Sequence, residues 1–400
     1  MNKKQVLMVM PVLKGGGAER VASILTNEFY NNGYSCEFLL TSCEKEDVIN
    51  RDLDKNIPLL ILREFFGKNF MVDAFYSFLR VLSSFLCKPF EKSKKSVPVL
   101  FSYLSFVSNY HKEIKAFEKL LKSRPDSTVI AFLQPSIPIV LLAGRKSKNK
   151  IIISERGDSN RLMKHRYGFG FIKKYYERAD RVVFQTVDAQ SVYPENIASK
   201  GTVIFNPIKE NLPERYTGER NKNITTFCRI SHQKNLPLLV DAFAELHKSY
   251  CDYRLRIIGD TANEDDEKAL KETKEIITKL GIGQLVDFEP FSFNVHQEII
   301  KDAVYVNSSD YEGMSNAMLE AMAIGMPVVC TDCPVGGAKA IIKNGENGIL
   351  VPMKDKKSLA DALLKIISDK ELSQQLSENA VKLKEELSLS NIAEKWIKLI

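Results

Sequence analysis

Residues 303–324 read AVYVNSSDYEGMSNAMLEAMAI, and this stretch decides the fold. Its first five residues have the short, apolar composition of a buried strand. The segment after the small and polar loop is apolar almost all round, as expected of a buried helix. A buried strand, a loop and a buried helix in this order make up half of a parallel βαβ unit. The stretch therefore predicts a parallel α/β sheet.

The same alternation runs through both halves of the chain. The candidate strands are residues 5–13, 36–41, 128–133, 150–154, 181–186 and 202–206 in the first half, and 224–228, 253–259, 285–289, 303–307, 326–331 and 348–351 in the second. Residues 206–220 between the two sets carry prolines, a glycine and charges, which is typical of an interdomain linker. We expect an α/β protein with two Rossmann-like, doubly wound parallel-sheet domains facing each other across a cleft. They comprise residues 1–207 and 208–400, and the pattern leaves open that the last helix packs back on the first domain.

The two halves carry opposite net charge, +12 over residues 1–200 and −5 over the remainder. No recognised binding motif accompanies the positive charge, so we expect no nucleic-acid partner. No uninterrupted apolar run reaches about 18 residues, so a cytoplasmic protein is expected. The seven cysteines have no framework spacing, which favours reduced thiols.

Much of the positive charge lies in residues 64–125, where lysines and arginines alternate with large apolar side chains, as in the stretch FYSFLR at 75–80. Two interpretations stay open. Such helices can lie in the interface of an anionic membrane, which would place the protein peripherally on the cytoplasmic face. Alternatively, they cover a hydrophobic core and expose a solvated basic face.

Ligands of open α/β sheets bind outside the carboxyl ends of the strands, so the loops after strands are examined first. Gly15–Gly17 join the first strand to a helix and would let a ligand approach the backbone closely; a simple tight turn is the alternative. Arg229 and Lys234 flank the loop after strand 224–228, and Asn235 is a candidate helix cap. Two cations beside a helix N-terminus suit a diphosphate, whereas ordinary surface cations are the alternative.

The loop at 310–316 adds two carboxylates. Glu320 is the only charge on the buried helix that follows, and a buried carboxylate needs hydrogen-bond donors. A ribose diol would supply two, while a buried arginine is the structural alternative. Glu312 precedes the helix, where the amides of Gly313–Asn316 could face a second polar or anionic group.

These residues carry a resemblance. The run from Glu312 to Glu320, continuing into AMAIGMPVV, resembles the signature of retaining glycosyltransferases of the GT-B fold in family 4, the glycosyl transferases group 1. Arg229, Lys234 and Asn235 and the stretches 255–260 and 345–352 agree with it. The stretches GGGAERV at 15–21 and DRVVFQT at 180–186 resemble those of members that build capsules and exopolysaccharides. The resemblance covers nearly the whole chain except about residues 64–125.

The resemblance implies transfer of a sugar from a nucleotide-diphosphate sugar, with uridine as the expected base, to a glycan or lipid-diphosphate-linked glycan acceptor. It further implies retention of the anomeric configuration and a place in surface polysaccharide biosynthesis. Arg229 and Lys234 would bind the diphosphate, and Glu312 would contact the sugar. The other implied donor contacts are Glu320 at the ribose, the loop residues Gly313, Met314, Ser315 and Asn316, the glycines Gly15, Gly16 and Gly17, and Asp260 near the base. No cofactor and no metal are expected.

Two departures leave alternatives open. Cys228 stands where the family has glycine, and the N-terminal loop that often carries a histidine reads ISERGD at 153–158. Glu155, Arg156 and Asp158 are therefore the candidates on the acceptor side. The alternatives are a sugar-nucleotide epimerase on the same fold and a catalytically silent partner that binds nucleotide sugars.

Overall fold

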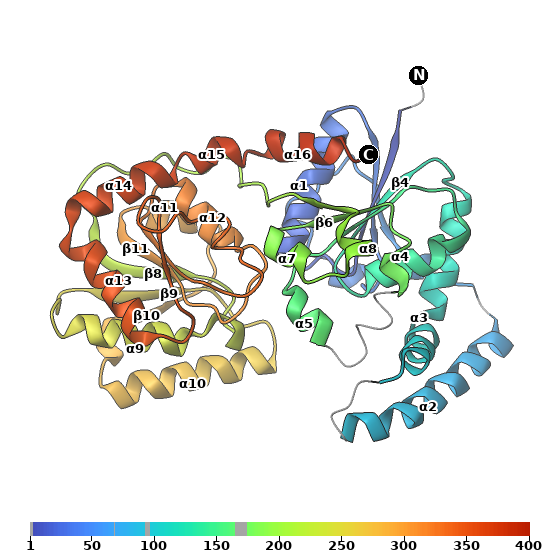
Figure 1. The fold of residues 1–400 in the computed structure, drawn as a ribbon, viewed down its shortest axis with the longest axis horizontal. Coiled ribbons are helices and arrows are strands. Elements are labelled where there is room, and N and C mark those ends of the chain that lie inside the picture. Colours follow the sequence, from blue (N-terminus) through green and yellow to red (C-terminus); the bar gives the residue numbers. More distant parts are fainter. Residues whose placement is uncertain (1–2, 68, 93–96, 165–173) are drawn as a thin grey trace. The chain divides into compact units, whose positions relative to one another are not determined.

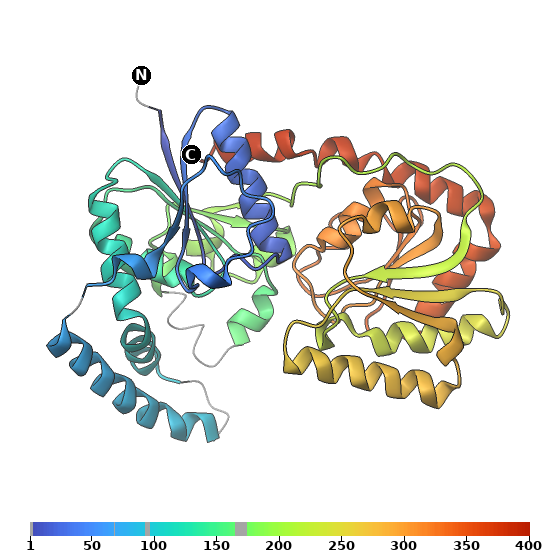
Figure 2. The same ribbon diagram turned by 180° about the vertical axis from the view of Figure 1, so that it is seen from behind.

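The computed structural model describes residues 3–67, 69–92, 97–164 and 174–400, and its chain divides into two compact units (Figures 1 and 2). The first unit comprises Met1–Phe205 together with Ile392–Ile400, and the second comprises Asn206–Asn391. The sequence placed the boundary after residue 207 and left open that the last helix packs back on the first domain. In the structure Ile392–Ile400 groups with the first unit.

The first unit is built on a seven-stranded parallel sheet in the order β3-β2-β1-β4-β5-β6-β7. The strands are β1 (Gln5–Met10), β2 (Ser35–Leu40), β3 (Leu59–Ile61), β4 (Thr128–Phe132), β5 (Ile151–Ser154), β6 (Arg181–Phe184) and β7 (Gly201–Val203). Its helices are α1 (Gly17–Asn31), α2 (Phe70–Lys92), α3 (Val99–Lys122), α4 (Ser136–Ala143), α5 (Ser159–Lys164), α7 (Val187–Ser191) and α8 (Glu195–Ala198). The central strands are apolar on both faces because helices cover both sides, as in other all-parallel sheets.

The last helix, α16 (Leu389–Ile397), ends in the core of the first unit. Trp396 is fully buried, and its ring stacks on Phe132 at the end of β4 with 5.6 Å between ring centroids. Burial of so large an aromatic surface explains why this segment groups with the first sheet.

The second unit contains a six-stranded parallel sheet in the order β10-β9-β8-β11-β12-β13. The strands are β8 (Asn221–Phe227), β9 (Arg254–Ile258), β10 (Val286–Glu289), β11 (Asp302–Asn307), β12 (Val328–Thr331) and β13 (Ile349–Val351). The helices are α9 (Leu236–His247), α10 (Glu264–Leu280), α11 (Val295–Ile299), α12 (Asn316–Ala323), α13 (Lys356–Ser368), α14 (Lys370–Ala380) and α15 (Leu383–Glu386). The apolar sides of α9 and α13 share one core cluster with the sheet.

The strand order of the second sheet locates the site. The chain runs outward from β8 to β9 and β10, and then returns to the other side of β8 with β11. The loop after β8 (residues 228–235) and the loop after β11 (308–315) therefore leave adjacent strands at the point where the order reverses. Such a switch point is where open α/β sheets bind ligands.

The fold class predicted from the sequence is confirmed: both units are doubly wound parallel sheets. Every predicted strand is present, with ends shifted by a few residues, and the prediction missed only the edge strand β3 among those described. Asn235 caps α9 as predicted, since its Oδ1 accepts a hydrogen bond from the Leu238 amide at 3.3 Å.

Candidate functional site

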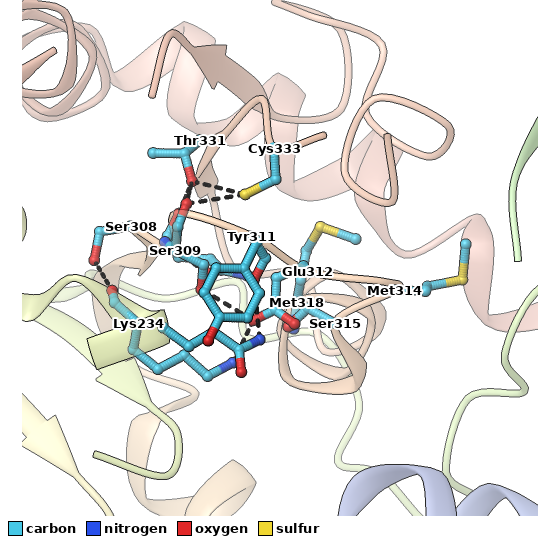
Figure 3. Close-up of polar contacts among 12 residues, drawn as sticks. Lys234, Ser308, Ser309, Tyr311, Glu312, Met314, Ser315, Met318, Thr331 and Cys333 are labelled. Atoms are coloured by element: carbon cyan, nitrogen blue, oxygen red, sulfur yellow. Dashed lines mark hydrogen bonds and ion pairs between the residues drawn. The ribbon is translucent and has the colours of Figure 1, made fainter. Parts of the chain in front are cut away.

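The loops after β8 and β11 are tied together by hydrogen bonds (Figure 3). The Ser308 hydroxyl donates to the Lys234 carbonyl at 2.8 Å. The Gln233 side-chain amide donates to the Tyr311 carbonyl, and the Asp310 amide donates to the Gln233 carbonyl, both at 2.9 Å. The side chains that these loops carry are therefore held on one rigid platform at the switch point.

Lys234 and Glu312 form an ion pair at the centre of this platform. Their side chains are 18% and 14% exposed, and the Ser309 hydroxyl lies 2.9 Å from the same Glu312 oxygen. Burial is the largest single influence on the pKa of Lys234 and would lower it, but the charge and hydrogen bond of Glu312, with a further contribution from Cys228, together outweigh burial, and the net pKa is raised. The ammonium therefore stays charged and ready to meet an anion that arrives at its exposed side.

Arg229 lies at the same strand end but is more accessible. Its side chain is 56% exposed, and its Nε is 3.6 Å from an Asp266 carboxylate oxygen near the start of α10. Cys228 beside it is a neutral thiol, because burial raises its pKa. Gly259 packs directly on this turn: a Cβ there would lie 1.9 Å from the Cys228 carbonyl oxygen. The two cations predicted for a diphosphate thus share one strand end.

Glu320 is buried on α12, as predicted, and its partner is a histidine. The carboxylate Oε2 lies 2.8 Å from the Nε2 of His296 on α11, and the two side chains are 4% and 8% exposed. An ionised carboxylate can only accept, so Nε2 carries the proton in this contact. The histidine ring meets Phe227 edge-on, with 5.5 Å between centroids. Sequence analysis missed His296, because nothing in its spacing connects it with Glu320.

The N-terminus of α12 is capped from both sides. Ser315 accepts a hydrogen bond from the Met318 amide at 3.3 Å. Asn316 accepts one from the Asn206 side-chain amide at 2.7 Å, and the same amide reaches the Met314 carbonyl at 3.3 Å. The predicted contact residues Met314, Ser315 and Asn316 are consequently fixed in place at a helix N-terminus, which favours negative charge.

The end of β12 supports the loop after β11 from behind. The Thr331 hydroxyl and the Cys333 thiol both donate to the Ser309 carbonyl, at 2.6 and 2.9 Å (Figure 3). Burial raises the pKa of Cys333 to about 12, so it is a structural thiol. Gly337 touches Gly313 so closely that a Cβ would lie 1.8 Å from the Gly313 carbonyl oxygen. A side chain at position 337 would therefore clash with the Gly313 backbone.

A hollow of about 260 Å³ opens beside the loop after β8. Its walls come from the ends of β8, β9 and β10 and from α10: Ile230, Gly259, Asp260, Thr261, Leu270, Lys274, Phe288, Glu289 and Pro290. Asp260 is itself held, since its carboxylate accepts a hydrogen bond from the Phe291 amide at 3.3 Å. The mixture of apolar walls and carboxylates suits a planar, polar group. A larger hollow of about 460 Å³ runs along α10 alone and offers no convergent loops.

In the first unit, the glycine loop leads into α1 as predicted. Gly15 has φ +85°, a conformation that favours glycine, and α1 begins at Gly17. The Glu19 carboxylate accepts hydrogen bonds from the amides of Lys14 and Gly16, the latter at 3.1 Å. Those two amides therefore already have an acceptor, a carboxylate of their own segment.

The predicted acceptor-side residue Glu155 is enclosed within the first unit. Its carboxylate accepts hydrogen bonds from the Tyr176 hydroxyl and from the Gln134 side-chain amide, the latter at 3.3 Å. Burial raises the pKa of Glu155, although both hydrogen bonds act in the opposite direction. The group is therefore placed to hold a proton rather than to contact bulk solvent.

Arg156 is also buried, with its guanidinium 4.6 Å from the Phe132 ring centroid and 5.4 Å from that of Trp396. Burial lowers its pKa to about 9. Asp158 lies nearer the surface, and its carboxylate accepts a hydrogen bond from the Asn160 amide at 2.9 Å, at the start of α5. Of the three acceptor-side candidates, Asp158 is the one whose side chain is not built into the core.

The raised pKa of Glu155 predicts a pH-dependent stability. Because the folded protein binds this proton more tightly than the unfolded chain, the stabilisation is complete below the unfolded pKa of about 4.3 and is lost as the pH rises through the folded pKa. Glu155→Gln should therefore gain stability relative to wild type between about pH 5 and pH 8. Urea unfolding of the variant and wild type at the two pH values measures the difference in their free energies of unfolding. If that difference is the same at both pH values, the carboxyl group is not desolvated.

The contact between His296 and Glu320 predicts a cost for removing the histidine. His296→Leu takes one donor from a buried carboxylate and should destabilise the protein by about 1–3 kcal/mol. His296→Gln, which can still donate, should lose less. Denaturant unfolding of each variant in the wild-type and Glu320→Gln backgrounds measures the coupling free energy between His296 and Glu320. If the two substitutions lower the free energy of unfolding additively, the interaction is ruled out.

Among the described residues, no group of three or more His, Cys, Asp or Glu side chains is arranged to hold a metal ion. Within the same ranges all seven cysteines are free thiols. What the site offers chemically is thus two cations, two carboxylates and a helix N-terminus around the ends of adjacent strands.

Comparison with known proteins links these features. Residues 209–383 match the family model of the glycosyl transferases group 1. An uncharacterized glycosyltransferase of Haemophilus influenzae is 26% identical over 219 residues, which cover 54% of this chain and 60% of the relative. An alpha-1,4-N-acetyl-D-galactosaminyltransferase of Campylobacter jejuni, named for its glycan linked to PP-undecaprenol, is 25% identical over 304 residues, or 74% of this chain and 80% of the relative.

The whole fold also has a solved counterpart. The crystal structure of HepE from Anabaena in complex with UDP superposes with a TM-score of 0.73 and 17% sequence identity, over 99% of this chain and 98% of that one. At this identity the likeness shows the architecture, in which two Rossmann-like domains form the GT-B fold.

Proposed function

We propose, because residues 209–383 match the family model of the glycosyl transferases group 1, that the protein is a glycosyltransferase that uses a nucleotide-diphosphate sugar. The observation that carries the proposal is the platform at the switch point of the second sheet. There the Lys234–Glu312 ion pair joins the loops that follow β8 and β11. The contact between Glu320 and His296 joins α12 to α11. One unit thus presents positive charge for a diphosphate and a buried acceptor group for a diol.

The donor is proposed to lie along the ends of the strands from β9 to β11. Arg229 and Lys234 bind the diphosphate, while Glu320, oriented by His296, accepts hydrogen bonds from the ribose. The base enters the hollow beside Asp260. The remaining contacts are those to the sugar, from Glu312 and the backbone of Gly313, Met314, Ser315 and Asn316. Uridine is the proposed base, with support from the UDP bound to the Anabaena protein.

Catalysis at such a site is mainly electrostatic. As the bond between the sugar and the diphosphate breaks, negative charge grows on the leaving oxygen, and a fixed ammonium stabilises that charge more than it stabilises the ground state. Lys234 is positioned to do this, because Glu312 and the two tied loops fix its direction. The proposal includes retention of the anomeric configuration, by attack on the donor face next to the leaving phosphate. This route needs no cofactor from the protein.

The acceptor is proposed to be a lipid-diphosphate-linked glycan in surface polysaccharide assembly, such as a capsule or exopolysaccharide. The Campylobacter jejuni relative, named for a PP-undecaprenol-linked glycan, supports this class. We place the protein in the cytoplasm, where it would meet the acceptor at the inner face of the membrane. Asp158 is the proposed side chain nearest the acceptor, with Glu155 and Arg156 positioning its loop.

The test is release of nucleotide diphosphate from a panel of nucleotide sugars, with and without a lipid-linked or soluble glycan acceptor. The proposal expects release that requires the acceptor, together with a product whose anomeric proton coupling matches that of the donor. Conversion of the donor without acceptor would favour an epimerase. Binding without turnover would favour a silent partner, and an inverted product would reject retention.

A further inference from the structure

Helix α2 exposes an apolar face that no other described element covers. Helix α2 packs on α3, its less exposed residues include Val72, Tyr76, Leu79 and Ser83, and both views place α3 between α2 and the sheet (Figures 1 and 2). The outer face carries large apolar side chains that are 38% to 88% exposed: Phe70, Met71, Phe75, Phe78, Val81, Leu82 and Phe85. Positions 71, 75, 78, 82 and 85 follow helical spacing, so they form one continuous stripe.

This stripe is unusual for a water-facing surface. Among the residues that the structure describes, Phe70–Phe90 is the single helical stretch long and apolar enough to cross a membrane by length and composition, and 11% of it is buried. The helix is about 35 Å long at 1.5 Å per residue, so the stripe is an extended patch rather than scattered single residues.

The charges on α2 select the partner. Asp73, the only acid in Phe70–Phe90, turns to α3, where its carboxylate pairs with Lys112 at 2.9 Å and with His111 at 3.1 Å. The cations Arg80 and Lys88 are exposed. At 3.6 residues per turn, Lys88 lies at the edge of the outer face and Arg80 lies nearer its opposite side, so the outer face carries no acid and is bordered by positive charge. A second copy of the same face would bring like charges together, whereas an anionic lipid surface complements both features.

The packing on α3 also decides how the helix would meet lipid. A spanning helix would have to separate from α3 and carry Asp73 away from its partners into hydrocarbon, which is costly. Lying in the interface leaves the inner face as it is and buries only the stripe, while the long stem of Lys88 at the edge of the stripe extends to the headgroups.

We propose that the outer face of α2 inserts in plane into the surface of a bilayer containing anionic phospholipids. This proposal rests on the proposed function only for its biological role, because membrane binding would bring the enzyme to a lipid-linked acceptor. Binding itself needs neither donor nor acceptor.

The experiment is flotation of the full-length protein with vesicles of phosphatidylcholine alone and of phosphatidylcholine mixed with phosphatidylglycerol. Wild type should float with the mixed vesicles. The triple variant Phe75→Ser/Phe78→Ser/Phe85→Ser should have an affinity for the mixed vesicles about tenfold lower or less, since affinity scales with the apolar area inserted. The matched control is Phe293→Ser in the second unit, whose side chain is 67% exposed, and it should bind as wild type does.

A second variant tests the charge independently of the apolar stripe. Arg80→Glu/Lys88→Glu should weaken binding to the mixed vesicles by roughly fivefold or more per position, with less effect on neutral vesicles. Thermal unfolding and nucleotide binding of each variant check that the fold is intact. Wild type that floats with neither vesicle, or a triple variant that floats as wild type does, would overturn the proposal. So would a wild-type dimer that the triple variant dissociates in the absence of any vesicle binding, since the face would then join two copies. Transfer to a soluble acceptor, measured in parallel, shows whether the proposed function stands when the membrane inference fails.

Discussion

Lys234→Met should lower kcat by about 10²- to 10³-fold, the usual cost of removing one fixed group that stabilises charge in a transition state. The Glu312 carboxylate pairs with the ammonium, and the Ser308 hydroxyl fixes the Lys234 backbone through a hydrogen bond to its carbonyl. A mobile lysine nearby would therefore not supply a positive charge at the same fixed place. Steady-state kinetics with saturating donor measure the effect. A higher KM with an unchanged kcat would mean that Lys234 binds the ground state and the transition state equally well.

The single substitution leaves Glu312 largely buried without its ammonium, which by itself destabilises a protein. The matched control is therefore Lys234→Met/Glu312→Gln, in which no charge is left unpaired. This double variant should recover stability towards that of wild type and still lack activity. Recovery of kcat in the double variant would instead show that the single substitution acted by disturbing the loops.

Glu320→Gln should weaken binding of the nucleotide by about 10- to 100-fold, because hydrogen bonds to a buried charged group contribute about 1.5–3 kcal/mol. The sharper readout is the preference for ribose. Wild type should bind UDP more tightly than 2′-deoxy-UDP, and Glu320→Gln should lose most of that preference. Calorimetric titration of both nucleotides measures it, and a preference that the variant retains in full would assign the ribose to another group.

His296→Gln is the companion to this measurement. It keeps a hydrogen-bond donor near Glu320 but removes the fixed ring that rests edge-on against Phe227. If the histidine orients the carboxylate, this variant should show a smaller ribose preference with kcat nearly unchanged. A variant with full preference would make His296 a purely structural partner.

Much of the architecture could be predicted because it depends on local pattern. Short β-branched runs such as Val328–Thr331 are buried on both faces of a parallel sheet, and helix signals such as the Asn235 cap lie next to the residues they affect. The edge strand β3 was missed, although the equally short strands β7 and β13 were predicted. The burial of Glu320 could be predicted from the apolar helix around it.

The partners of the charged groups could not be predicted. His296 reaches Glu320 from another helix, and Glu155 is enclosed by Tyr176 from a distant part of the chain. Such contacts depend on how loops of different length bring elements together, which no spacing in the sequence encodes. The same is true of Arg156, an acceptor-side candidate in the sequence, whose guanidinium lies against Phe132 and Trp396 of the C-terminal helix.

The central claim is that the switch point of the second sheet holds a nucleoside diphosphate. It is tested most directly by calorimetric titration of UDP and the other nucleoside diphosphates into wild type and Glu320→Ala. The account predicts that wild type binds one of them with a single site per chain, and that Glu320→Ala loses most of the affinity while keeping its fold. Absence of binding by every nucleotide, or equal affinity in the variant, would contradict it.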